Sequence, residues 1–284
     1  MLVNRFKIHF QEQLKDEYPL EEINSFFHLL TEAYLGLTRL DLALDPSAEI
    51  PDGMKPKFED ALQRLSHHEP IQYILGITEF FGLQFRLDPN VLIPRPETEE
   101  LVEWILDDLK GAGKHDISIL DIGTGSGCIA ISLAKNLPLA RVIAIDVAEA
   151  ALKIAGENAR LNKVDVEFLK MDILQSENLP EKFDVIVSNP PYVRELEKRE
   201  MHRNVLEHEP HLALYVKDED PLIFYRKITK LAETALLEHG SLYFEINQYL
   251  GAETGELLES SGLKTELRKD LFGNFRMLKG NKEN

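Results

Sequence analysis

The four residues Asn189-Pro190-Pro191-Tyr192 could hold a planar polar group at the end of a strand. They follow an apolar run over residues 183–188, which predicts a buried strand. Neither proline has an N–H to donate, so the strand must end there and the turn must be stiff. Ligands of open parallel sheets bind just outside the carboxyl ends of the strands. The stretch is therefore either a substrate-binding wall or a loop that only terminates a strand.

A glycine-rich turn follows an earlier predicted strand. Its spacing, G-x-G-x-G, differs from the dinucleotide pattern G-x-G-x-x-G, and the sequence contains no G-x-x-x-x-G-K-[ST] phosphate loop. Such glycines let the backbone approach a ligand, and the next helix offers unpaired N–H groups. The acid before the turn would repel phosphate and favour a cationic ligand such as S-adenosylmethionine. A tight turn without a ligand is the alternative. The residues that we assign to this cofactor are Asp121, Gly123, Thr124, Gly125, Ser126 and Gly127.

Two further acids follow the next two predicted strands. Asp146 could accept hydrogen bonds from both hydroxyls of a ribose, as in other nucleoside-binding α/β folds. Asp172, followed by Ile173, could accept from an adenine amino group. Each acid alone is typical of a solvated loop, but acids at the ends of three successive strands predict a nucleoside pocket. Asn189 ends the next strand and would lie beside that pocket.

The elements that must position these residues alternate between strand and helix. Strands are predicted at 117–122, 141–146, 164–169, 183–188 and 240–246, and helices at 129–137, 148–161 and 223–237. This alternation predicts βαβ units, and hence an α/β fold with a largely parallel sheet covered on both faces.

Upstream of this region, a helix is predicted to have Pro96 in its first turn and to end near Gly111 and Gly113. Alternating apolar residues around Gly82 predict a short hairpin. Residues 1–75 show helical periodicity, for example at Phe6 and Phe10. This part is either a bundle that only stabilises the chain or a docking module for the substrate, and periodicity does not separate the two.

Composition restricts the partners. The chain has 284 residues and a formal net charge of −17, and it has no run of basic residues. Nucleic-acid binding depends on Lys and Arg neutralising phosphates, so we expect no direct nucleic-acid binding. The single cysteine, the lack of a long apolar run and the lack of a signal-peptide pattern at the N-terminus lead us to expect a cytoplasmic protein without a membrane segment. The nine histidines show no metal-ligand spacing, so we expect no metal.

These motifs together resemble class I S-adenosylmethionine-dependent methyltransferases, and the Asn-Pro-Pro-Tyr tetrapeptide resembles that of enzymes that methylate a planar nitrogen. Three further stretches resemble one family, the peptide chain release factor glutamine-N5 methyltransferases (the PrmC or HemK family). They are the connector Val91-Leu92-Ile93-Pro94-Arg95-Pro96-Glu97-Thr98-Glu99, Glu209-Pro210 with Ala213-Leu214, and Lys269-Asp270-Leu271-Phe272-Gly273 with Arg276. The resemblance covers residues 70–280, and the helical region before them matches in kind and length.

The resemblance implies a Rossmann-like seven-stranded methyltransferase sheet in residues 96–284, a β-hairpin linker in 76–95, and a small helical domain in 1–75 that docks the release factor. The methyl acceptor would be the Gln of the Gly-Gly-Gln motif in class 1 release factors, and we expect a monomer. Asn189, Pro190 and Tyr192 would be catalytic, and Pro191 would also contact the substrate. The Asn189 side-chain oxygen and the Pro190 carbonyl would accept the amide N–H groups, while Tyr192 would pack on the flat amide.

Two other functions use the same motifs. One is an adenine-N6 or guanine-N2 nucleic-acid methyltransferase, and the other is a non-catalytic S-adenosylmethionine-binding scaffold. The sequence also departs from the family pattern at 216–222, where Pro221 replaces a glycine, and at 245–249, where the glycine after the strand is missing. We expect neither departure to touch the residues that carry the chemistry, and we assign no role to Arg95 or Glu97.

Overall fold

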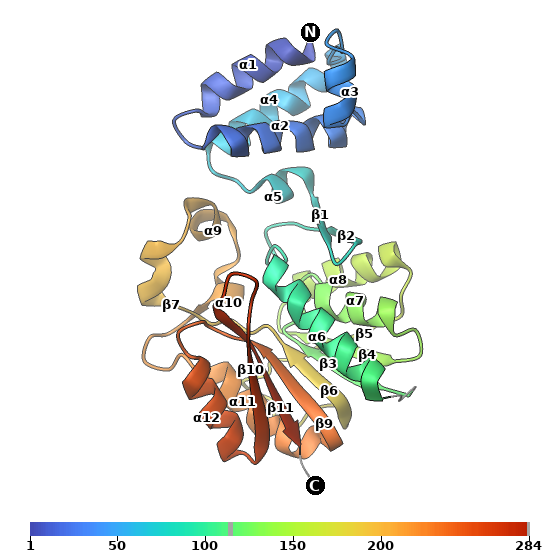
Figure 1. Cartoon of the computed structure of the whole chain (residues 1–284), viewed down its shortest axis with the longest axis vertical. Helices are drawn as coiled ribbons and strands as arrows, with labels where there is room; N and C mark the ends of the chain where they lie inside the picture. Colours follow the sequence, from blue (N-terminus) through green and yellow to red (C-terminus); the bar gives the residue numbers. More distant parts are fainter. Residues whose placement is uncertain (113–115, 283–284) are drawn as a thin grey trace. The chain divides into compact units, whose positions relative to one another are not determined.

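The computed structural model describes residues 1–112 and 116–282. The chain forms two compact units: Met1–Gly76 with His202–His208, and Ile77–Met201 with Glu209–Asn284 (Figure 1). Each unit has a hydrophobic core of its own, so each is described by itself.

The first unit is helical, as the periodicity of its sequence predicts. Phe6 and Phe10 of its first helix, Phe27 of the second and Phe58 of the fourth are fully buried and meet in one aromatic cluster. Its elements are α1 (Val3–Leu14), α2 (Leu20–Leu35), α3 (Arg39–Leu44), the short 3-10 helix η1 (Asp52–Met54), α4 (Lys55–Ser66), α5 (Ile71–Leu75) and α9 (Arg203–His208).

The turn between α2 and α3 shows how the sequence sets helix ends in this unit. Gly36 has φ 68°, the left-handed conformation that a glycine adopts without a Cβ clash, and its N–H closes the end of α2. Thr38 then caps α3, since its hydroxyl accepts from the N–H of Asp41 while the Asp41 carboxylate accepts from the N–H of Thr38. Gly36 and Thr38 therefore separate two helices.

The second unit begins with the predicted hairpin. Its strands β1 (Ile77–Phe80) and β2 (Leu83–Arg86) pair antiparallel around Gly82, which has φ 70°. The helix that follows, α6 (Pro96–Ala112), starts at Pro96 as predicted. The helix was expected to end near Gly111 and Gly113, and it ends at Ala112. Gly113 lies outside the described residues.

A seven-stranded sheet forms the centre of this unit. Its order is β10-β11-β9-β6-β3-β4-β5, in which β9, β6, β3, β4 and β5 run parallel to one another and β11 pairs antiparallel with both β10 and β9. The strands are β3 (Ser118–Ile122), β4 (Arg141–Asp146), β5 (Glu167–Lys170), β6 (Phe183–Ser188), β9 (Leu236–Glu245), β10 (Leu263–Lys269) and β11 (Phe275–Lys282). The helices are α7 (Cys128–Asn136), α8 (Glu149–Asn162), α11 (Ile223–Ala235) and α12 (Gly251–Ser260).

The α/β Rossmann-like fold expected from the sequence is confirmed. The excursion after β6 adds a two-stranded parallel sheet and short helices: β7 (Val193–Arg194), β8 (Tyr215–Val216), η2 (Glu195–Glu200) and α10 (His211–Leu214).

Two predicted strand starts are wrong. A strand was predicted from residue 240 after a helix to residue 237, but α11 ends at Ala235 and β9 begins at Leu236. A strand was predicted from Val164, but β5 begins at Glu167. The reason for the late start of β5 is the end of α8. There Lys163 takes a left-handed conformation, its N–H donates to the Arg160 carbonyl, and the N–H of Val164 donates to the Ala159 carbonyl. This pair of bonds closes the helix, so the backbone of Val164 serves the helix end and not the sheet.

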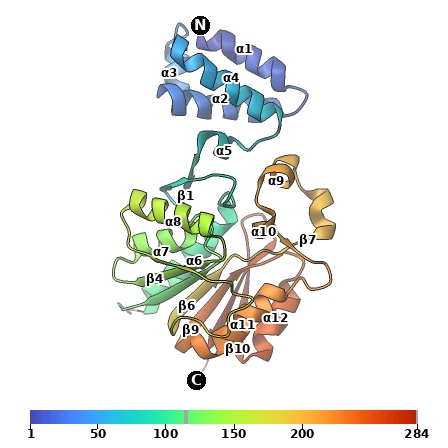
Figure 2. The same cartoon turned by 180° about the vertical axis from the view of Figure 1, so that it is seen from behind.

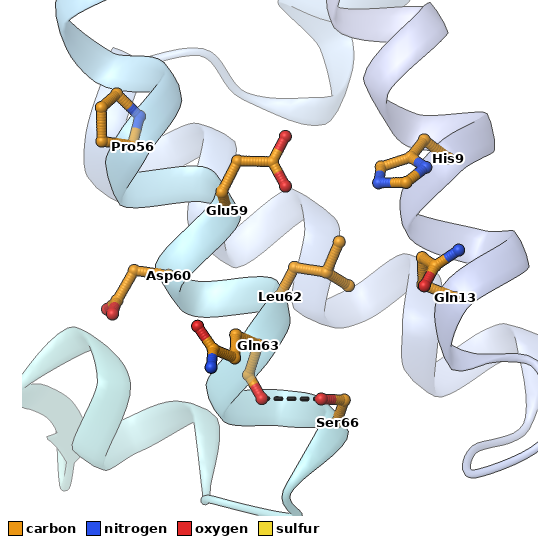
Figure 3. A pocket seen from close by; sticks show the side chains of 8 residues that line it. All are labelled: His9, Gln13, Pro56, Glu59, Asp60, Leu62, Gln63 and Ser66. Carbon is orange, nitrogen blue, oxygen red and sulfur yellow. Dashed lines mark hydrogen bonds between the residues drawn. The ribbon is translucent and has the colours of Figure 1, made fainter.

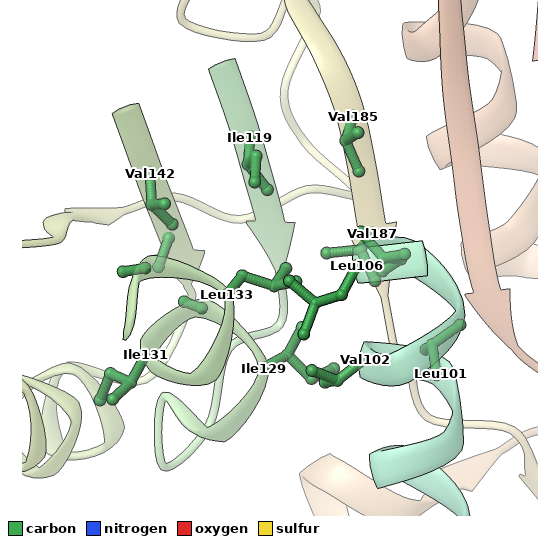
Figure 4. Packing of buried hydrophobic residues seen from close by; sticks show 14 of the residues in the cluster. Leu101, Val102, Leu106, Ile119, Ile129, Ile131, Leu133, Val142, Val185 and Val187 are labelled. Atoms are coloured by element: carbon green, nitrogen blue, oxygen red, sulfur yellow. The ribbon is translucent and has the colours of Figure 1, made fainter. Parts of the chain in front are cut away.

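Helices cover both faces of the sheet. Figures 1 and 2 show α6, α7 and α8 on one face, with α11 and α12 on the other. Along β3, Ile119 packs on the first face and Leu120 on the second, the alternation expected of a strand buried on both sides. In Figure 4, side chains of α6 and α7 meet the first face of β3, β4 and β6.

We predict that Gly127→Ala destabilises the protein. Gly127 has φ 83°, and an added Cβ would lie 2.8 Å from Cδ1 of Ile131 and 3.1 Å from Cβ of Ala155. Strain and overpacking together should lower the free energy of unfolding by about 2 kcal/mol or more, measured by urea denaturation. Gly156→Ala is the matched control within α8, because nothing lies within 4 Å of its added Cβ. It should stabilise by about 0.5–1 kcal/mol. Equal stabilities for the two variants would contradict this account.

Candidate active site

The register of the parallel strands brings the candidate residues into one row. Ile122 of β3 pairs with Ile145 of β4 and with Ser188 of β6, and Ser188 pairs with Phe244 of β9. The residues that come directly after these paired residues therefore lie side by side at one edge of the sheet, in the order Asp146, Gly123, Asn189 and Glu245. We call these four the strand-end residues. The chain reverses its direction of winding between β3 and β6, which is where ligands of doubly wound sheets bind.

The glycine-rich turn leaves open space beside its backbone. Gly123 and Gly125 have φ values of 75° and 55°, and nothing lies within 4 Å of a Cβ added to either. Gly127 instead packs against α7 and α8. Ser126 is buried, and its carbonyl accepts from the amide of Asn158. The turn can thus admit a ligand on the side of Gly123 and Gly125.

Asp121 is a buried acid with one oxygen unused. Its Oδ2 accepts from the Thr124 hydroxyl at 2.6 Å and from the Ala130 N–H at 3.3 Å. Its Oδ1 is buried and has no hydrogen-bond partner within the described part of the chain. Burial raises the pKa of Asp121 from 3.8 to about 7. A positive charge placed beside this carboxylate would relieve both the burial cost and the unmade bond.

The other two acids differ from each other in their surroundings. Asp146 is half-buried and ties down the loop, since its oxygens accept from the N–H groups of Gly125 and Ala148, each at 2.9 Å. Asp172 is exposed, and its Oδ1 accepts from the N–H of Leu174. Ile173, next to it, is buried in the core on the second face of the sheet. Both carboxylates keep lone pairs that could accept from a ligand.

Asn189 and Pro190 present acceptors that other described residues do not use. The Asn189 Nδ2 group donates to the Thr98 hydroxyl at 3.4 Å. Within residues 1–112 and 116–282, no group donates to the Asn189 Oδ1 or to the Pro190 carbonyl. Strand pairing ends at Ser188, because the prolines that follow cannot continue it. Pro190 is buried and Pro191 is half-buried, so the turn is held firmly.

A buried glutamate binds this turn from the neighbouring strand. Glu245, which is 1 % exposed, accepts from the Thr98 hydroxyl at 2.6 Å and from the Tyr192 hydroxyl at 2.9 Å. Burial raises the pKa of Glu245, while these two hydrogen bonds and the charge of Arg276 oppose that rise. Burial and the nearby Glu245 charge raise the pKa of Tyr192 well above its ordinary value. Tyr192 therefore stays a neutral donor.

One expectation about the departures from the family pattern is wrong. We expected residues 245–249 not to touch the chemistry, but both Glu245 and Asn247 contact the tetrapeptide. Asn247 Nδ2 donates to the Tyr192 carbonyl at 3.0 Å and to Glu197 at 2.9 Å. An asparagine after the strand supplies a donor that a glycine cannot supply, so this departure supports the turn directly.

Two of the stretches that resemble the family contact each other: the connector, residues 91–99, and the segment that begins at Glu209. Arg95 donates to the buried Glu209 at 2.6 Å, and the N–H of Ile93 donates to the other oxygen of Glu209 at 3.4 Å. The third stretch lies near Glu245 through Arg276, whose Nε donates to Asp270 at 3.4 Å. The connector itself reaches the strand ends through Thr98, which contacts Glu245 and Asn189.

Hollows elsewhere in the molecule do not contain the strand-end residues. One of about 580 Å³ lies between α1 and α4 of the first unit, where His9 and Gln13 face Glu59 and Gln63 (Figure 3). Another of about 650 Å³ lies near the end of α7 and the start of β4. No group of three or more His, Cys, Asp or Glu residues suited to a metal is present among the described residues. In the same part of the chain, no helix is long and apolar enough to cross a membrane.

Sequence reasoning missed three residues of this site: Thr98, Glu245 and Asn247. Glu245 follows the apolar run Leu242-Tyr243-Phe244, the same strand-end pattern that singled out Asp121 and Asp146. That pattern could have identified it. Thr98 and Asn247 carry no such signal, because only the fold brings them to the tetrapeptide.

Solved structures with the same fold are methyltransferases. A methyltransferase from Pyrococcus furiosus aligns with a TM-score of 0.53 at 19% identity, covering 80% of this chain and 100% of that chain. A Thermus thermophilus 16S rRNA N2 G1207 methyltransferase aligns with a TM-score of 0.54 at 20% identity, covering 73% and 50%. At these identities the likeness concerns the fold alone, which is an α/β Rossmann-like fold.

The sequence comparisons are more specific. Residues 8–76 match the PrmC N-terminal domain and residues 100–213 match the methyltransferase small domain. A release factor glutamine methyltransferase of Flavobacterium psychrophilum is 56% identical, covering 99% of each chain. One of Bacteroides thetaiotaomicron is 44% identical over 99% of this chain and 100% of its own. The chain belongs to the release factor glutamine methyltransferase family.

We predict that Tyr192→Phe destabilises the protein more at pH 8 than at pH 5. The pKa of Glu245 is raised, so its contribution to stability is present at low pH and is lost as the pH rises through its folded-state pKa. Removing a hydroxyl donor raises that pKa further and should cost about 1–3 kcal/mol where Glu245 is ionised. Urea denaturation at the two pH values measures this. Tyr249→Phe, at an exposed tyrosine, is the control. A cost that does not change with pH would refute the link to Glu245.

Proposed function

We propose that this protein transfers a methyl group from S-adenosylmethionine to the side-chain amide nitrogen of the Gln in the Gly-Gly-Gln motif of class 1 peptide chain release factors. The observation that carries this proposal is the pair of acceptors, Asn189 Oδ1 and the Pro190 carbonyl, that the described residues leave unused at the edge of the sheet. Two acceptors match the two N–H groups of a carboxamide, and family membership supports the choice of substrate.

The chemistry explains why two acceptors are needed. A carboxamide nitrogen is a weak nucleophile, because its lone pair is delocalised into the carbonyl. Asn189 and Pro190 would hold both N–H groups, orient the nitrogen and stabilise the positive charge that develops on it. Tyr192, whose hydroxyl is held by Glu245, would offer its ring to the flat amide. These residues would act by orienting the nitrogen and stabilising its charge, and the methyl transfer itself would need no strong general base.

The residues around the glycine-rich turn fit the cofactor. When bound, S-adenosylmethionine supplies a methyl group carried on a positively charged sulfur. Asp121 Oδ1 is a buried oxygen without a described partner, so a cationic group fits beside it. Gly123 and Gly125 would let the backbone approach the cofactor, while Asp146, Asp172 and Ile173 would face its nucleoside. The proposed reaction uses no metal.

We also propose that the first unit docks the release factor and that the enzyme acts as a cytoplasmic monomer. The unit has its own aromatic core, so it does not need the sheet to bury its apolar residues. Residues 1–80 carry 14 Asp and Glu against 7 Lys and Arg, which suits a protein partner with a basic surface better than a nucleic acid.

Asn189→Ala should lower the rate of methyl transfer to purified release factor by about 10³-fold or more, because one acceptor is lost. Its affinity for S-adenosylmethionine should stay within about twofold of the wild type, since the hydrogen bonds of Asp121 and Asp146 to the glycine-rich turn are unchanged. Transfer of tritiated methyl groups and isothermal titration calorimetry measure the two effects. Asn136→Ala is the control, because Asn136 caps the far end of α7 by bonding the Ser132 carbonyl.

The same assay separates the substrates. The wild type should label release factor, and should not label DNA or RNA of equal concentration. Label on nucleic acid without label on the factor would refute the proposed substrate. Near wild-type transfer by Asn189→Ala would refute the proposed mechanism.

Asp121→Asn should remove a pH dependence of cofactor binding. Because the pKa of Asp121 is raised to about 7, a proton competes with a cationic ligand below that pH. The affinity of the wild type for S-adenosylmethionine should therefore fall by up to about tenfold per pH unit below pH 7. Calorimetry between pH 6 and pH 8 tests this. Asp165→Asn, at an exposed acid in the segment before β5, should keep the wild-type dependence. If the affinity of Asp121→Asn for S-adenosylmethionine showed the wild-type pH dependence, Asp121 would not be the residue that binds the cofactor's charge.

A further inference from the structure

We propose that Glu245 and Thr98 set the polarity of the Asn189 amide, so that its oxygen and not its nitrogen faces the methyl acceptor. Both are positioning residues that act through Asn189, and this inference rests on the function proposed above. The contacts form a chain across three elements: Glu245 at the end of β9, Thr98 in the first turn of α6, and Asn189 after β6.

The number of hydrogens that Thr98 can donate decides how the Asn189 amide is turned. A threonine hydroxyl has one hydrogen to donate, and an ionised carboxylate can only accept. Thr98 lies 2.6 Å from Glu245 Oε2, so its one hydrogen is committed to that contact. The Thr98 oxygen can then only accept, and the group of Asn189 that faces it must be the NH2 group, 3.4 Å away. The amide oxygen of Asn189 is consequently turned the other way.

The hydrogen bonds of Glu245 and the charge of Arg276 favour the ionised form that this count requires. Its second oxygen accepts from the Tyr192 hydroxyl at 2.9 Å, and the guanidinium of Arg276 acts on it electrostatically. Burial and the charge of Glu97 act against ionisation. The Tyr225 hydroxyl, on α11, donates to the backbone carbonyl of Glu245 at 3.3 Å and accepts from the N–H of Asn247 at 3.3 Å. Both carboxylate oxygens thus accept from hydroxyl donors.

The polarity matters because the two ends of an amide have nearly the same shape. If the Asn189 amide were reversed, it would fit the same space. Its NH2 group would then face the N–H groups of the substrate glutamine, and hydrogen-bond donors would meet donors. An unsatisfied pair of this kind costs about 1–3 kcal/mol, which corresponds to a rate loss of about 5- to 150-fold. Neither proline next to Asn189 can correct the orientation, because neither has an N–H. The choice must come from another part of the fold, and Thr98 is the residue in contact.

Two substitutions test the chain of contacts. Glu245→Gln keeps the shape but brings an NH2 group that can donate to Thr98, freeing the Thr98 hydroxyl to donate to Asn189. Thr98→Val keeps the shape and removes the hydroxyl. Each should lower kcat for release factor methylation by about tenfold or more and leave the Kd for S-adenosylmethionine unchanged. The double variant should be no slower than Thr98→Val alone, because the glutamine oxygen can still accept from the Tyr192 hydroxyl and the other oxygen of Glu245 acts through Thr98.

Thr98→Ser restores the hydroxyl and should recover at least half of the wild-type kcat. Thr254→Val, at an equally buried threonine of α12 that bonds only the Leu250 carbonyl, is the matched control for loss of a buried hydroxyl. Thermal denaturation of every variant accompanies the kinetics. In addition, the 15N-labelled side-chain amide of Asn189 should shift in Thr98→Val and in Glu245→Gln but not in Thr254→Val.

The outcomes are distinguishable from failure of the proposed function. If the wild type methylates release factor while Glu245→Gln retains its kcat, or if the two single losses multiply in the double variant, the positioning role is refuted and the function stands. The positioning role is likewise refuted if Thr98→Ser is as slow as Thr98→Val. If the wild type does not methylate release factor, the function fails. The Asn189 amide signal then still tests the polarity, and an unchanged signal in both variants would refute it.

Discussion

The site depends on the register of four parallel strands. Ile145, Ile122, Ser188 and Phe244 pair across β4, β3, β6 and β9, and the residue after each lies at the edge of the sheet. A slip of one residue in any strand would turn its buried side chains to the other face. Helices pack on both faces of the sheet, so such a slip would disrupt the packing of apolar side chains on each face. The hydrophobic core therefore fixes the positions of the polar groups at the ends of these strands.

Two buried acids at this edge have opposite surroundings. Glu245 has a hydroxyl donor on each oxygen, so its environment is complete within the protein. Asp121 has donors on one oxygen and none among the described residues on the other. Leaving a buried carboxylate oxygen unpaired costs stability, and such a cost is typical of positions that serve a ligand. The contrast supports a structural role for Glu245 and a binding role for Asp121.

Much of the fold and part of the site could be predicted because their signals are local. The apolar run at Phe183–Ser188, the two prolines after it and the alternate glycines act through their own backbones. Strand-end acids were also recognisable by position. Thr98 could not be found in this way, because its meaning depends on Glu245, which lies 147 residues away in the sequence. The start of β5 was missed because the closing bonds of α8 use residues whose composition suits a strand.

The tetrapeptide itself explains why its support comes from side chains of other elements. Two consecutive prolines make the turn stiff, but they remove the N–H groups by which a backbone normally attaches to its neighbours. Other segments must supply the donors. Asn247 donates to the Tyr192 carbonyl, and the Tyr192 hydroxyl in turn donates to Glu245. The side-chain amide of Asn247 after β9 thus supplies a donor that the prolines after β6 lack, which is how this departure from the family pattern supports the turn.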